Sequence, residues 1–109
     1  TYTCAGHATI GTGALPYRHG IFQNTFFDRV RNELGRCTDD PAAKRIPYGK
    51  EGRQTHGPAQ LGVPTLGDEM RRSGSRVVAL ALKARSAIML AGHGGDAVTW
   101  LSETFDSWE

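Results

Sequence analysis

PTLGDEMRRSGSRVVALAL, residues 64–82, joins a helix pattern directly to a strand pattern. The first half begins with Pro64, places two acids before two arginines and ends at Gly74. This order suits the helix macrodipole and the usual helix boundaries, so a short helix is predicted over residues 64–74. Residues 76–82 form a continuous apolar run, which is typical of a buried parallel strand. A helix followed by such a strand indicates an α/β fold.

The N-terminal residues predict a second helix. Residues 3–12 are rich in small side chains compatible with a helix, and Gly11 and Gly13 are expected to end it. Pro16 is then expected to begin a loop.

Two hairpins are predicted around this framework. Residues 20–28 are rich in Phe and Ile and indicate a strand, and residues 30–38 indicate its returning partner. Residues 39–64 hold many prolines and glycines, so an irregular surface loop is expected there. Residues 97–101 together with residues 105–108 predict the second hairpin.

Length and composition predict one globular domain. The chain has 109 residues, of which 39% are apolar and 22% charged, a balance typical of such a domain. The net charge of +2 is too small, and Lys and Arg are too scattered, to indicate nucleic-acid or membrane binding. No apolar run approaches the ~18 residues of a membrane span.

The two cysteines leave the redox state open. Cys4 and Cys37 can pair in an oxidising compartment, but two separated thiols favour the simpler interpretation of buried or free cysteines. Residues 1–109 show no signal-peptide pattern, and the first of them is Thr1 instead of Met. Mature secreted domains also begin without Met, so this observation decides little.

One glycine-rich motif is similar to a nucleotide-binding fingerprint. Residues 92–97 fit the loose dinucleotide fingerprint Gly-x-Gly-x-x-Ala. That fingerprint needs a helix after it, because the helix N-terminus binds the pyrophosphate. Residues 98–101, VTWL, instead favour a strand, so a nucleotide-binding fold is not expected. Residues 11–13 lack the Lys of a phosphate-binding loop.

Histidine spacing argues against a self-contained zinc site. No two histidines lie three or four positions apart, and the cysteines form no close Cys-x-x-Cys pair. A metal ion would therefore need ligands from outside this chain. None of the histidines receives a catalytic role, and the one in the glycine-rich turn is expected to be exposed; they are His7, His19, His56 and His93.

Several segments in a fixed order resemble one enzyme family. They are residues 3–13 (TCAGHATIGTG), 16–21 (PYRHGI), 24–28 (NTFFD), 64–68 (PTLGD) and 82–88 (LKARSAI). The first two are similar to the nucleophile segment of the nucleotide pyrophosphatase and phosphodiesterase branch of the alkaline phosphatase superfamily. The whole set resembles even more closely the phosphate-irrepressible bacterial alkaline phosphatases of that branch. The last segment matches their Ser-Leu-Lys-Asp-Arg sequence, with Ala84 in place of Asp.

The resemblance implies both a fold and a nucleophile. The implied fold is a partial alkaline-phosphatase-like α/β domain with a mostly parallel sheet, flanking helices and peripheral hairpins, over residues 1–109. Thr3 matches the nucleophile, which also contacts the metal and forms a phosphothreonine intermediate. A hydroxyl at a helix start suits this role, since the positive dipole end favours an alkoxide and a bound phosphate. The alternative is that Thr3 merely caps the helix.

Three further residues are expected to bind the phosphate. Asn24 matches the residue whose amide donates to a non-bridging phosphoryl oxygen; otherwise it is a polar residue on an exposed strand face. Lys83 and Arg85 match the cation pair of the monoesterase-like members. If the strand continued through them, both side chains would point to one face. Alternatively, they are solvated cations at a strand end.

The same resemblance implies two zinc ions about 4 Å apart. Their Asp and His ligands fall outside residues 1–109, so this chain is expected to be an inactive fragment of a longer periplasmic or extracellular enzyme. Hydrolysis of a small phosphate monoester is the leading hypothesis. Two alternatives stay open: a nucleotide pyrophosphatase or phosphodiesterase, which normally lacks the paired cations, and a non-catalytic phosphate-binding or structural module.

Overall fold

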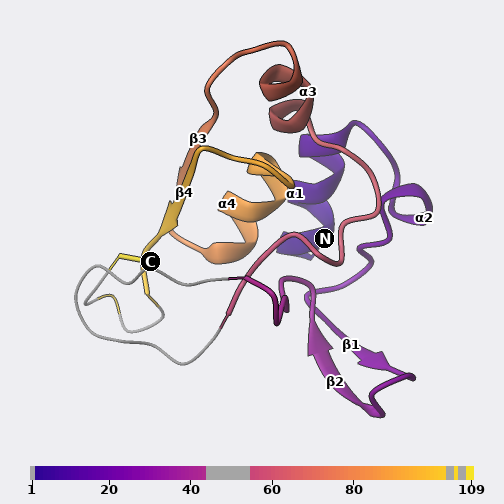
Figure 1. The fold of residues 1–109 in the computed structure, drawn as a ribbon. Helices are drawn as coiled ribbons and strands as arrows, with labels where there is room; N and C mark the ends of the chain where they lie inside the picture. The colour runs from indigo at the N-terminus through magenta and orange to yellow at the C-terminus, as the bar shows by residue number, and fades with distance from the viewer. Residues whose placement is uncertain (1, 44–54, 103–104, 106–107) are drawn as a thin grey trace.

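The computed structural model describes residues 2–43, 55–102, 105 and 108–109. Figure 1 shows α1 and α4 at the centre, α2 and α3 at the edge of the molecule, and the two pairs of strands on different sides of the central helices. The elements follow one another along the chain as α1 (Thr3–Thr12), α2 (Pro16–His19), β1 (Thr25–Asp28), β2 (Glu33–Arg36), α3 (Leu66–Arg72), β3 (Val78–Ala81), α4 (Ala84–Ala91) and β4 (Ala97–Trp100).

The β3-α4-β4 unit confirms the α/β prediction. β3 and β4 pair in parallel, with Val78 opposite Ala97, and α4 connects them. Because a strand rather than a helix follows the glycine-rich turn, the structure also agrees that this turn is no dinucleotide fingerprint. The prediction that this strand is buried is wrong, because its residues alternate between exposed and half-buried. Val78 and Leu80 are 70% and 67% exposed, since α4 packs on the opposite face of the strand pair.

Helices α1 and α4 run in the same direction and pack closely together (Figure 1). The contact is tightest at Gly11, where an added Cβ would collide with the backbone carbonyl of Met89. Gly11 therefore lies within the helix and does not end it; Gly13, with φ 67°, forms the left-handed C-cap. Around this contact lies the buried apolar core, made of Cys4, Ala8, Ile21, Cys37, Leu61, Ile88 and Met89.

Helix α3 forms as predicted, although it is shorter than residues 64–74. The side chain of Thr65 accepts a hydrogen bond from the Asp68 N–H (3.1 Å), and the Asp68 carboxylate accepts one from the Thr65 N–H (2.9 Å). This reciprocal capping box satisfies two helix donors and sets the start of the helix at Leu66.

The segment after α1 differs from the prediction in two respects. Pro16 begins the short helix α2 rather than a loop, because its fixed φ suits the first position of a helix. The predicted strand over residues 20–28 contracts to β1, since Gly20 ends α2 with φ 82° and Ile21 turns into the core. The hairpin itself is confirmed: β1 pairs antiparallel with β2, and Thr25 faces Arg36.

Most of the predicted 39–64 loop lacks regular structure where it is described. Residues 44–54 lie outside the described part of the chain, and Asp39 and His56 on either side form one antiparallel bridge. The predicted C-terminal hairpin appears as an antiparallel bridge between Leu101 and Trp108. β4 itself, however, pairs in parallel with β3.

Cys4 and Cys37 form a disulfide, and both are fully buried. The interpretation of free thiols is therefore wrong. None of the described helices is both long and apolar enough to cross a membrane.

Candidate active site

Thr3 is the first residue of α1, but it does not cap the helix. Tyr2 occupies the N-cap position, and no side-chain hydrogen bond caps this end. The interpretation of Thr3 as a cap is therefore wrong. Its backbone carbonyl accepts a hydrogen bond from His7 Nδ1 (2.8 Å), if that ring nitrogen carries the hydrogen. Thr3 is half-buried and lies in the first turn of α1, where backbone N–H groups favour negative charge.

Asn24 is held at the same helix end. The backbone N–H of Cys4 donates to Asn24 Oδ1 over 2.9 Å. Since this contact uses the amide oxygen, the amide NH2 group keeps its two hydrogens for other acceptors. Asn24 is half-buried and precedes β1, so the alternative of an exposed strand position is wrong. The structure therefore brings Thr3 and Asn24 together, although they are far apart in sequence.

Lys83 and Arg85 flank the start of α4. Lys83 is its N-cap, and Arg85 lies in its first turn. The expectation that strand geometry would align both side chains is wrong, because the helix begins at Ala84. Within the described residues, neither cation is paired with a carboxylate. Lys83 is exposed and Arg85 half-buried.

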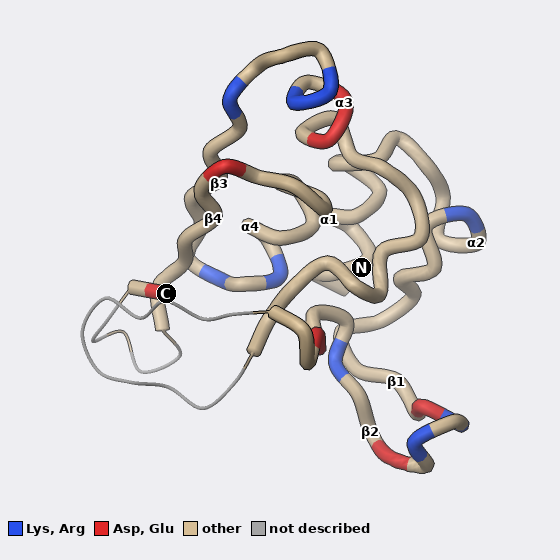
Figure 2. The backbone as a smooth tube through the Cα atoms, viewed as in Figure 1, with Lys and Arg blue, Asp and Glu red and all other residues tan. Residues whose placement is uncertain are grey.

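The parallel direction of α1 and α4 places their N-termini at the same end of the helix pair. Figure 2 shows the two basic positions at the start of α4 on this side of the molecule. Lys83 also follows the carboxyl end of the parallel strand β3, which is where α/β sheets bind their ligands. Two helix N-termini and two cations thus favour an anion at this end.

The described residues do not fit a complete zinc site. They contain no group of three or more His, Cys, Asp or Glu side chains that could hold a metal ion. Structural and catalytic zinc sites need three or four such protein ligands. Among the predicted site residues, only Thr3 is expected to contact a metal.

His19 is a buried structural residue. The Ile21 N–H donates to its Nδ1 (3.1 Å), so Nε2 carries the hydrogen and donates to the Thr9 hydroxyl (3.0 Å). Burial lowers the pKa of His19. These two contacts join α1 to the segment after α2.

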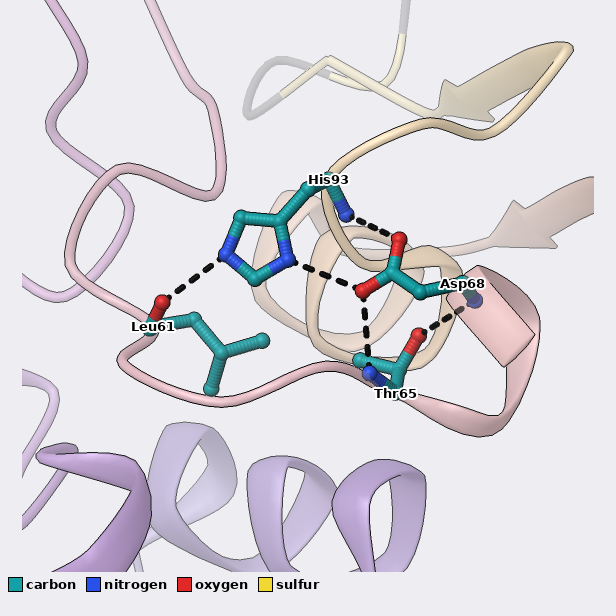
Figure 3. A network of polar contacts seen from close by, with 4 residues as sticks. All are labelled: Leu61, Thr65, Asp68 and His93. Atoms are coloured by element: carbon teal, nitrogen blue, oxygen red, sulfur yellow. Dashed lines mark hydrogen bonds and ion pairs between the residues drawn. The ribbon is translucent and has the colours of Figure 1, made fainter. Parts of the chain in front are cut away.

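A second polar network, which the sequence did not reveal, centres on His93 (Figure 3). His93 Nδ1 lies 2.8 Å from Asp68 Oδ2, and Nε2 lies 2.8 Å from the Leu61 carbonyl oxygen. The His93 backbone N–H also donates to Asp68 Oδ1 (2.7 Å). The network links the turn after α4 to the N-terminus of α3 and to the loop before it. The expectation that His93 is exposed is confirmed, since its side chain is 42% exposed, but both of its ring nitrogens have hydrogen-bond partners.

Both ring nitrogens of His93 face oxygen acceptors, which favours the doubly protonated ring. Burial alone would lower the pKa of His93, but the hydrogen bonds to Asp68 and Leu61 and the Asp68 charge together raise it. Burial alone would raise the pKa of Asp68, but the hydrogen bonds from His93 and Thr65 lower it. The nearby Arg71 pairs with Asp96 (3.5 Å), so its charge is partly balanced. Since Nε2 meets a carbonyl and not a hydroxyl, this dyad has no nucleophile to activate.

We expect His93→Ala to lower the free energy of unfolding by about 1 kcal/mol at about pH 6, at the low end for charged hydrogen bonds because the ring is partly exposed. The pKa of His93 is higher in the folded state than its unfolded value of 6.5. The contribution of His93 to stability is therefore complete below pH 6.5 and is lost as the pH rises through the folded pKa. Urea unfolding at about pH 6 and about pH 9 should therefore show a smaller difference between wild type and variant at the higher pH.

Two further variants serve as comparisons for this experiment. Asp68→Asn should also destabilise more at the lower of these pH values, whereas Glu69→Gln should change little, because Glu69 pairs with Arg72 on the surface (3.5 Å). His19 also has a shifted pKa, so it contributes to the pH dependence of stability. This contribution is the same in wild type and variant, so it cancels in each difference. An equal effect of His93→Ala at both pH values would contradict a charged His93.

Residues 1–102 match the family model of type I phosphodiesterases and nucleotide pyrophosphatases. The chain belongs to this family. The resemblance inferred from the nucleophile segment is thus confirmed, and so is the alkaline-phosphatase-like fold, because the structure superposes on a crystal structure of wild-type alkaline phosphatase PafA with a TM-score of 0.88. That match has 30% sequence identity and covers 98% of this chain and 21% of PafA.

Other relatives of this phosphodiesterase-family chain also match over nearly its whole length. Alkaline phosphatase PhoK of Sphingomonas sp. is 39% identical over 93% of this chain and 18% of its own length. A Myroides odoratus protein named calcium-transporting ATPase is 35% identical over 99% of this chain and 20% of its own. A PafA variant substituted at a Thr, an Asn, a Lys and an Arg superposes with a TM-score of 0.87 and 26% identity. The chain thus spans about a fifth of these relatives.

Proposed function

We propose that this chain is a partial catalytic domain, residues 1–109, of a zinc-dependent phosphate monoesterase. It supplies the nucleophile Thr3 and three phosphate-binding residues, Asn24, Lys83 and Arg85. The observation that carries the proposal is the hydrogen bond from the Cys4 N–H to Asn24 Oδ1. It holds a free amide NH2 group beside the helix end that begins with Thr3.

In this proposal the Thr3 oxygen attacks phosphorus and expels the alcohol of the ester. The phosphoryl group is then carried on Thr3 until water releases it as phosphate and restores the hydroxyl. The first turn of α1 favours the negative charge that gathers here, and the Asn24 NH2 group donates to a non-bridging oxygen. Holding nucleophile and phosphate together in this way accounts for a large part of the rate enhancement.

Lys83 and Arg85 favour a monoester over a diester. A monoester carries about one more negative charge, and both cations lack a carboxylate partner among the described residues. The substituted Thr and Asn of the PafA variant are 21 positions apart, as are Thr3 and Asn24, and its Lys and Arg are two positions apart, as are Lys83 and Arg85. This spacing supports the assignment of the four residues and favours monoesterase over diesterase or a non-catalytic module.

The two zinc ions require ligands beyond the described residues. We place those ligands in the rest of the enzyme, since the relatives are about five times longer than this chain. Thr3 is the one residue here that we assign to the metal. The Cys4–Cys37 disulfide supports a periplasmic or extracellular location, because disulfides persist in oxidising compartments.

Trapping the intermediate tests this function. The complete enzyme is mixed with a phosphate monoester and quenched in acid, and its peptides are analysed by mass spectrometry. We expect phosphate on Thr3, loss of the modified peptide after treatment with a chelator, and its return when zinc is added. Rapid hydrolysis with no phosphorylated Thr3 at any quench time would contradict the nucleophile assignment. Turnover unaffected by the chelator would contradict the metal dependence.

A further inference from the structure

The Cys4–Cys37 disulfide joins the two segments that form the proposed phosphate site. Cys4 follows Thr3 in the first turn of α1, and Cys37 follows directly after β2. The bond spans 33 residues of sequence, and both cysteines are fully buried in the core. It thus ties the helix that carries the nucleophile to the hairpin that begins at Asn24.

Both half-cystines also bind Asn24 through their backbone. The Cys4 N–H donates to the side-chain Oδ1 (2.9 Å), and the Cys37 N–H donates to the backbone oxygen of Asn24 (2.9 Å). One contact fixes the direction of the amide, and the other fixes the main chain that carries it. Asn24 is therefore held between the two ends of a single covalent cross-link.

We propose that the Cys4–Cys37 disulfide is a positioning element of the active site, which keeps the Asn24 amide donor at a fixed place relative to the Thr3 hydroxyl. The inference rests on the proposed function, because it assigns the disulfide to that reaction. Neither cysteine touches the substrate. Their effect on the reaction passes through Asn24.

Loss of the cross-link should therefore cost catalysis as well as stability. A donor serves a transition state only when it is held to within about 0.5 Å of its productive position, and a misplacement of about 1 Å can cost roughly a hundredfold in rate. Without the bond, only the two hydrogen bonds and the core contacts relate Asn24 to Thr3. We expect kcat/KM for a phosphate monoester to fall by roughly ten- to a hundredfold.

A double-mutant cycle in the complete enzyme separates positioning from folding. The paired substitutions Cys4→Ala and Cys37→Ala are made both with Asn24 present and with Asn24→Ala. If the disulfide acts through Asn24, its loss costs the full factor in the first background and less than about threefold in the second. Equal losses in the two backgrounds would overturn the inference, because a stability effect does not depend on the amide.

Two controls keep the result interpretable. His93→Ala removes hydrogen bonds that lie outside the site, so it destabilises the fold but should leave kcat/KM unchanged below its melting temperature. A wild-type enzyme that hydrolyses no phosphate ester would refute the proposed function itself. An active wild type with equal losses in the cycle would refute only the role of the disulfide.

If the double alanine variant does not fold, a chemically lengthened bridge between the two cysteines tests the inference instead. A dithiol first reduces the disulfide to two thiols and is itself oxidised to its own disulfide. The two thiolates then displace both iodides of diiodomethane, which leaves a sulfur–methylene–sulfur bridge between Cys4 and Cys37. This bridge keeps the loop closed but makes it one carbon longer. We expect the bridged protein to remain folded and to lose activity; full activity would overturn the inference.

Discussion

Thr3→Ala in the complete enzyme should lower kcat by roughly a thousandfold or more, which corresponds to about 4 kcal/mol of transition-state stabilisation. The reason is chemical: alanine has no oxygen to form the bond to phosphorus, so the two-step route through a phosphothreonine is closed. What activity remains should come from direct attack by water on a phosphate still bound by Asn24 and the two cations. Single-turnover kinetics with acid quench would show hydrolysis without any phosphoprotein.

The fold should survive this substitution. Tyr2 occupies the N-cap position, and no side-chain hydrogen bond caps α1, so the Thr3 hydroxyl is not needed to hold the helix. Alanine is also a favourable residue in the first turn of a helix. Thermal unfolding of Thr3→Ala should thus match wild type closely. Thr3→Ser, which keeps the hydroxyl, is the paired control and should retain much of the activity. Near-wild-type turnover by Thr3→Ala would refute the nucleophile assignment.

Local patterns predicted the helices that carry their own boundary signals. Gly13 ends α1 in the left-handed conformation, and the acids and arginines of α3 lie in its first and last turns as their order predicted. Both signals lie within a few residues of the element they define, so the sequence alone is enough to read them. The apolar run before Lys83 likewise identified β3, whose parallel partner was then confirmed.

The errors arose where contacts distant in sequence decide the structure. The Phe- and Ile-rich residues 20–28 have the composition of one strand, but Ile21 enters the core while Phe22 remains 62% exposed, and only β1 pairs. The Asp68–His93 bond joins residues 25 positions apart. Its signals, an acid in a capping box and a histidine in a glycine-rich turn, are each common, so neither pointed to the other.

The assignment of Thr3, Asn24, Lys83 and Arg85 came from the family resemblance and from no local pattern. What the structure adds is proximity: the Cys4 N–H brings Asn24 to the start of α1, and the parallel helices bring the start of α4 to the same end. Spacing along the chain does not predict such an arrangement, because it depends on how α1 packs on α4. The roles of these four residues therefore need direct kinetic tests.

Arg85→Ala and Lys83→Ala should each lower kcat/KM for a phosphate monoester by roughly ten- to a hundredfold. Removing one charge-assisted contact typically costs about 1.5–3 kcal/mol. If these cations bind the extra negative charge of a monoester, as we propose, hydrolysis of a diester should fall much less, because a diester lacks that charge. The measurement is kcat/KM for p-nitrophenyl phosphate and for a methyl diester with the same leaving group, so that leaving-group chemistry cancels in the ratio.

The ratio of kcat/KM for the monoester to kcat/KM for the diester distinguishes the possible roles of Lys83 and Arg85. Arg72→Ala is the matched control: Arg72 is an exposed arginine whose partner is Glu69, so its loss should change neither rate. Equal losses on monoester and diester in the Arg85 and Lys83 variants would assign both residues to general positioning. No loss on either substrate would make them surface cations and favour the diesterase alternative. A loss of kcat/KM confined to the monoester would follow only if both cations bind the extra negative charge that the monoester carries and the diester lacks.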